Sequence, residues 1–210
     1  MADYTGKGSF GVVILAFVAA SCQTPVPEIT SGLDISSALR VGQPAEIVVL
    51  PLVDASQNQN FTAQLRAHAR VEIANALIDR RYTSLAKGFV DTVVAREAVS
   101  IANSSVADAA YLVSVKGSWD EDAVLGIRVD RWDGSRIRDG GFLYFEAEVT
   151  MIDSGTGETL CSGQISGTVK AGGAGAAPIA GSARVMDATT QFALAIIDQF
   201  PRRWPGKGKN

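Results

Sequence analysis

The sequence contains few of the side chains that carry metal, redox or acid–base chemistry. Its 210 residues include one histidine, His68, and two cysteines, Cys22 and Cys161. A zinc site needs three or four ligands, and a histidine-based triad needs a nucleophile and an acid beside the ring. We therefore interpret His68 as a structural or half-exposed helix residue and Cys161 as a buried, inert thiol. We expect no metal, no cofactor and no catalytic residues.

The chain also lacks an excess of basic residues. Lysine and arginine number 19 against 22 aspartates and glutamates, which gives a net charge of −3. Nucleic-acid binding needs a basic field, so this class of partner is excluded. Hydrophobic residues make up 47% of the chain and charged residues 20%, as in ordinary globular proteins. A chain of this length can bury a sizeable core in one domain.

The amino terminus carries an apolar run that is too short to cross a bilayer. Residues 10–20 are 11 uncharged residues, whereas a membrane-spanning helix needs about 20. The length fits the hydrophobic region of a signal peptide. The run ends in Ala19-Ala20-Ser21-Cys22, which resembles the bacterial lipobox except that Ala19 replaces the usual leucine. The alternatives to a lipoprotein signal are an ordinary cleaved signal peptide and a helix that is partly inserted into the membrane.

The lipobox resemblance implies lipidation at Cys22. It implies cleavage after Ser21, diacylglycerol on the Cys22 sulfur and acylation of the new amino terminus; stable anchoring takes more than one chain. Gln23 follows in place of the aspartate that favours inner-membrane retention, which implies the outer membrane. The chain then divides into a signal peptide (1–21), a lipidated cysteine with a proline-rich tether (22–44), one α/β domain (45–202) and a basic tail (203–210). The tail is either a membrane contact or a frayed terminus.

Hydrophobic periodicity predicts a mixed α/β (α+β) domain. We expect strands at 46–52, 82–86, 110–117, 126–132, 142–153 and 158–169, and helices at 61–81, 90–102 and 183–200. The clearest strand is 142–153, where apolar residues alternate with Glu146, Glu148 and Thr150. The helices should pack on one face of a mixed sheet, and the carboxy-terminal strands should form an antiparallel meander with a wet face.

Three features resemble one group of small envelope lipoproteins. They are a first strand ending in Leu-Pro-Leu at 50–52, the Ala107-Asp108 entry to an apolar segment, and the turn at 153–158. In this order they are similar to the TolB amino-terminal domain, whose relatives include the curli-secretion lipoprotein CsgG and the lipoprotein activators of penicillin-binding proteins. The resemblance implies an adapter or assembly domain without catalysis. Residues 119–141 hold six acids and four arginines, which argues against a lipid-facing hairpin.

The sequence therefore predicts a lipid-anchored periplasmic adapter that binds another envelope protein. The binding surface would be the wet sheet face or the 119–141 segment. Trp119 and Trp132 are the candidate partner contacts, since tryptophan is enriched at binding hot spots, although both could equally belong to the core. The alternative is an envelope lipoprotein that binds a small ligand or a glycan. An enzyme would need a nucleophile–base pair that the sequence does not display.

Overall fold

A mixed β-sheet forms the centre of the protein. The computed structural model describes residues 28–41, 44–56, 60–96, 106–172 and 181–204. The strands are β1 Glu28–Ser31, β2 Asp34–Ile35, β3 Glu46–Val49, β4 Val53–Asp54, β5 Thr83–Ser84, β6 Ala123–Asp133, β7 Phe142–Asp153 and β8 Thr159–Lys170. The helices are α1 Ser37–Arg40, α2 Ala63–Asp79, α3 Lys87–Arg96, α4 Ala109–Val115, α5 Ile137–Gly140 and α6 Gly181–Ile197. The expected α+β class with a mixed sheet is confirmed.

The sheet combines an antiparallel meander with a parallel edge. Its order is β1-β8-β7-β6-β3-β5, with β2 also on β8 and β4 also on β6. Strands β6, β7 and β8 pair antiparallel, whereas β3 runs parallel to both β5 and β6. Strand β7 has the bounds that its alternation predicted, and its apolar residues are buried on one side. The alternation of apolar and polar residues along the sequence therefore predicted both the position of β7 and the face that it buries.

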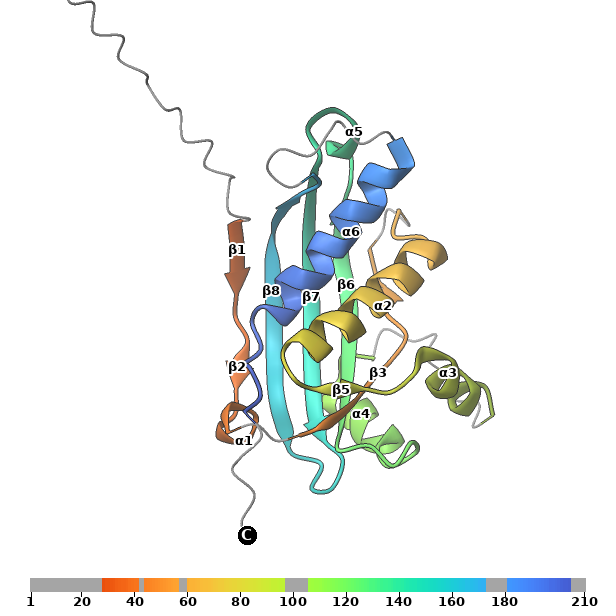
Figure 1. Ribbon diagram of the computed structural model, residues 1–210, viewed down its shortest axis with the longest axis vertical. Coiled ribbons are helices and arrows are strands. Elements are labelled where there is room, and N and C mark those ends of the chain that lie inside the picture. The colour runs from red at the N-terminus through yellow and green to blue at the C-terminus, as the bar shows by residue number, and fades with distance from the viewer. Residues whose placement is uncertain (1–27, 42–43, 57–59, 97–105, 173–180, 205–210) are drawn as a thin grey trace, which may run out of the picture.

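Two of the three predicted helices, α2 and α6, cover one face of the sheet, as expected (Figure 1). The third, α3, instead contributes Val90 and Val93 to the buried cluster on the opposite face. Helix α2 begins after Thr62, whose hydroxyl caps the Leu65 amide. Aromatic rings join the helices to the strands. Phe61 stacks on Trp132 with ring centroids 4.1 Å apart, and Phe192 of α6 meets Trp132 and Phe145 edge-on at 5.2 and 4.9 Å. Such pairs add to the stability that burial of these large side chains provides.

The segment predicted as a strand at 110–117 is a helix, and this prediction was wrong. Helix α4 lies at one end of the opposite face, where Leu112 and Val115 share a buried cluster with Val124 of β6 and Ile152 of β7. Short apolar runs fit a strand and a buried helix equally well, and packing decides between them. The approach is close because Gly126 has no side chain: a Cβ there would lie 1.9 Å from the Val106 carbonyl oxygen.

The segment expected to be a tether is in part an edge of the sheet. Strands β1 and β2 pair antiparallel with β8, and Ile29, Leu33 and Ile35 pack against the core. Two glycines of β8 permit this: a Cβ at Gly163 would lie 2.3 Å from the Gly32 oxygen, and one at Gly167 2.4 Å from the Glu28 oxygen. The structure thus differs from the expectation for residues 28–41, whereas Cys22 and Gln23 lie outside the described residues.

None of the helices in the described ranges is both long and apolar enough to cross a membrane.

Candidate interaction surface on the polar face of the sheet

One side of the central strands carries charged and polar groups without a covering helix along most of its length. We call this surface the polar face. It is formed by Arg128, Asp130, Arg131, Tyr144, Glu146, Glu148, Gln164 and Ser166. These side chains alternate with the core residues of β6, β7 and β8, so they point away from α2 and α6. The wet sheet face that the sequence predicted is therefore present at these positions.

A first group of charges centres on Arg128. Its Nε lies 2.7 Å from an Asp130 carboxylate oxygen, and its Nη2 lies 2.6 Å from Glu148 on the neighbouring strand. Arg128 and Glu148 are directly opposite each other in the β6–β7 register. The hydrogen bond to Asp130 is the main cause that raises the pKa of Arg128. These side chains are 22–29% exposed, so both pairs are half-buried.

A second group lies one step along the same strands. The Arg131 Nη1 is 3.5 Å from Glu146, and the Tyr144 hydroxyl donates a hydrogen bond of 2.7 Å to the same carboxylate. The Arg131 guanidinium also lies over the Tyr144 ring, 4.8 Å from its centroid. The hydrogen bond to Glu146 raises the pKa of Tyr144. The Arg131 and Glu146 side chains are 55% and 42% exposed, so this group is open to solvent.

A β-bulge brings the two groups onto one face. Val129 pairs with Ala147 and Arg131 pairs with Glu146, so Asp130 is the extra residue on β6. Without the bulge, Arg128 and Arg131 would point to opposite sides, because side chains alternate along a strand. The alternation in the sequence reveals the polar positions of β7, but no sequence pattern indicates the bulge at Asp130. The partnership of Arg131 with Tyr144 and Glu146 was therefore missed.

The polar face suits recognition of another macromolecule. On this surface two cations and three carboxylates surround a partly exposed tyrosine. The exposed Arg131–Glu146 pair contributes about 0–1 kcal/mol, so each of its members can exchange this partner for another at small cost. Arginine and tyrosine are also the residue types that are enriched at binding hot spots.

The structure places both predicted contact residues in the core. Trp119 and Trp132 are 4% and 1% exposed. The Trp119 indole nitrogen donates to the Val90 oxygen at 3.4 Å, and its backbone amide donates to Glu121. Trp132 belongs to the aromatic cluster under α2 and α6. Burial removes both from the accessible surface, in agreement with the core alternative. The sequence does not show whether a tryptophan is buried or exposed, so it could not distinguish a core residue from a partner contact.

The residues considered for chemistry lie apart from one another. His68 Nε2 lies 3.0 Å from the Thr190 hydroxyl, which ties α2 to α6. Cys161 is buried, and desolvation raises the pKa of its thiol to about 12. Across the described part of the chain, no three His, Cys, Asp or Glu side chains are grouped so as to hold a metal ion.

Comparisons with known proteins concern the fold. No family model and no curated protein matches the sequence. Lipoprotein GNA1162 from Neisseria meningitidis matches at 19% identity and TM-score 0.48, over 74% of this chain and 97% of that one. A PelC dodecamer from Paraburkholderia phytofirmans matches at 14% identity and TM-score 0.44, over 85% and 100%. LpoB from E. coli matches at 13% identity and TM-score 0.43, over 81% and 83%.

Proposed function

We propose that this protein is a lipid-anchored component of the bacterial envelope that binds another envelope protein through the polar face, without catalysis. The observation that carries the binding role is the polar face itself, a charged surface held in a fixed register and left open to solvent. The Ala19-Ala20-Ser21-Cys22 sequence supports the anchor, and Gln23 favours the outer membrane. The leucine-proline-leucine strand end and the 153–158 turn support a TolB-amino-terminal-like relationship.

The position of β1 supports a domain held close to the membrane. Glu28, the first residue of β1, is six residue steps after Cys22, with five residues between them. Six residues span at most about 20 Å when fully extended. The sheet edge would therefore remain within about 20 Å of the lipid headgroups, whereas the tether expected from the sequence would allow more than twice that reach. A partner bound to the polar face would also be close to the membrane.

Site-specific photocrosslinking tests the binding surface. Gln164 is exposed on the polar face opposite Glu148, and Gln64 is exposed on α2, on the other side of the sheet. A photoreactive residue at each glutamine gives a matched pair of probes. We expect a discrete adduct with one envelope protein from Gln164 and none from Gln64. The Arg131→Ala, Tyr144→Ala double variant should abolish this adduct by removing two side chains of the types enriched at binding hot spots.

A matched variant controls for indirect effects. Arg138 is an exposed arginine at the end of the sheet, outside the polar face, so Arg138→Ala should leave the Gln164 adduct unchanged. Equal adducts from Gln164 and Gln64, or an adduct that survives removal of Arg131 and Tyr144, would contradict binding through the polar face.

A further inference from the structure

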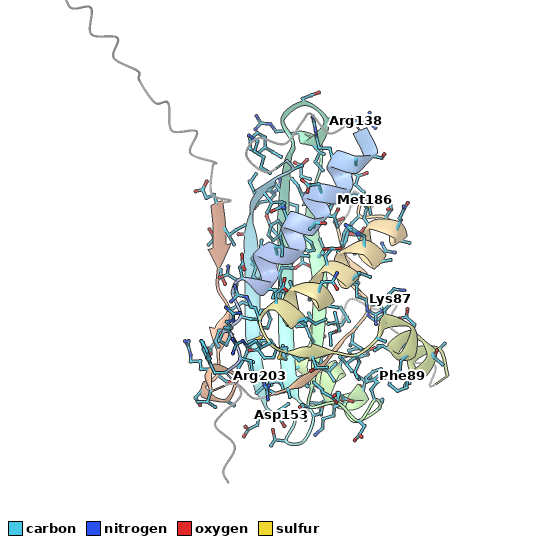
Figure 2. All side chains as sticks on the ribbon, in the orientation of Figure 1. Lys87, Phe89, Arg138, Asp153, Met186 and Arg203 are labelled. Carbon is cyan, nitrogen blue, oxygen red and sulfur yellow. The ribbon has the colours of Figure 1, made fainter. Side chains whose placement is uncertain are left out.

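A cleft between α2 and α3 lies beyond the end of β3, away from the polar face. Its volume is about 350 Å³, which lies within the range of small-ligand sites. Leu52, Val94 and three alanines supply apolar walls, and Arg66, Arg70, Lys87 and Asp91 supply charged groups. Figure 2 shows Lys87 on the side of α3 that faces α2. Apolar walls with a few converging polar groups are typical of sites for small organic molecules.

Arg70 is the unusual member of this cleft because its charge is almost completely buried. The residue is 4% exposed. Its Nε donates to the Val49 oxygen at 2.8 Å, and its Nη1 bonds to Asp91, but its Nη2 has no hydrogen-bond partner among the described residues. A buried donor without a partner destabilises the folded state, and such exceptions call for an explanation. The bond to the end of β3 holds the guanidinium in place beside the cleft.

The charges around Arg70 do not balance. Lys87 Nζ lies 2.9 Å from Asp91, so Arg70 and Lys87 share one carboxylate. Arg66 is paired with Asp54 at 3.9 Å. Three cations and two carboxylates thus leave an excess of one positive charge among the described charged residues that line the cleft or form an ion pair with its lining. The Lys87 side chain is 44% exposed, so solvent weakens its ion pair with Asp91 and the ammonium can turn to another anion.

We propose that this cleft binds a small aliphatic carboxylate. The carboxylate bonds to Lys87 beside the buried Arg70 guanidinium and supplies the missing negative charge, and the hydrocarbon part packs against Leu52 and Val94. A monoanion matches the excess of one charge, whereas a phosphate monoester carries about −1.5 to −2 near neutral pH. This site is separate from the polar face, so it makes the protein a ligand-binding adapter whose two surfaces are tested independently.

Isothermal titration calorimetry tests this proposal with hexanoate as the probe. The full chain, extracted from membranes in detergent, is titrated with hexanoate, hexan-1-ol and hexylamine, and empty micelles give the reference heats. We expect saturable binding of hexanoate and none of the alcohol or the amine, because the alcohol lacks the charge and the amine carries the wrong one. No saturable heat with hexanoate, or equal binding of hexan-1-ol, would overturn the proposal.

Substitutions then locate the binding. Lys87→Met should weaken hexanoate binding about tenfold or more, as expected for loss of a hydrogen bond to a charged group, whereas the matched Lys170→Met change on β8 should have no effect. Ala67→Phe should fill the cleft and abolish binding while it leaves Arg70 intact. Arg70→Met removes a buried charge that is hydrogen-bonded to the Val49 oxygen, so it can also destabilise the fold. A loss of binding in Arg70→Met is therefore interpreted only together with the results for Lys87→Met and Ala67→Phe. Binding that is unchanged in both Lys87→Met and Ala67→Phe would overturn the assignment to this cleft.

Discussion

At the scale of single residues, missing side chains matter as much as those that are present. Gly126, Gly163 and Gly167 each leave space for another backbone segment within 2.4 Å of where a Cβ would stand. Gly126 admits the segment that leads into α4, and the two glycines of β8 admit the amino-terminal edge. The sequence shows these glycines but not the partners that approach them, so close approaches of this kind were not predictable.

Gly126→Ala should strongly destabilise the fold. The added methyl group would meet the Val106 oxygen and the Leu112 side chain, and overpacking of this kind costs about 3 kcal/mol. The matched change Gly88→Ala, on α3, meets no atom within 4 Å, and it should stabilise the helix by about 0.5–1 kcal/mol. The free energies of unfolding from urea titration give both values. Equal stabilities for the two variants would contradict the packing of α4 on the sheet.

At the scale of elements, a helix or strand could be predicted from the sequence only where its hydrophobic pattern was long enough. Strand β7 and helix α2 were predicted because each carries a long, regular period, and the polar positions of β7 followed directly. Helix α4 was missed because its seven residues are too few to distinguish a helix from a strand. The polar face was predicted in outline, but the ion pairs of Asp130 and Arg131 depend on the bulge at Asp130, and the α2–α3 cleft depends on how two helices meet.

Gly167→Ala should release β1 from the sheet. A Cβ at this position would lie 2.4 Å from the Glu28 oxygen, so the antiparallel pairing of β1 with β8 cannot be kept without a shift. We expect hydrogen exchange at residues 28–31 to become faster while β7 stays protected, since edge elements open separately from the core. Gly155→Ala, in the β7–β8 turn, serves as the control. Unchanged protection of β1 in Gly167→Ala would contradict this account of the edge.

At the scale of the whole molecule, the edge formed by β1 and the two proposed binding surfaces have a defined arrangement. The amino-terminal segment enters at one edge of the sheet and the polar face lies on its open side, while α2 and α6 cover the other side (Figure 1). The cleft between α2 and α3 lies beyond the opposite edge, past β3. The polar face and the cleft that we propose as binding sites therefore occupy separate regions, so a change in one need not block the other.

The intact mass of the protein extracted from membranes tests the central claim most directly. We predict the loss of residues 1–21 and the gain of acyl chains, since the lipobox resemblance implies both. The Cys22→Ala variant, purified in the same way, should be unprocessed or released from the membrane. A wild-type mass that shows simple cleavage without acylation, or no cleavage at all, would contradict a lipid-anchored envelope protein.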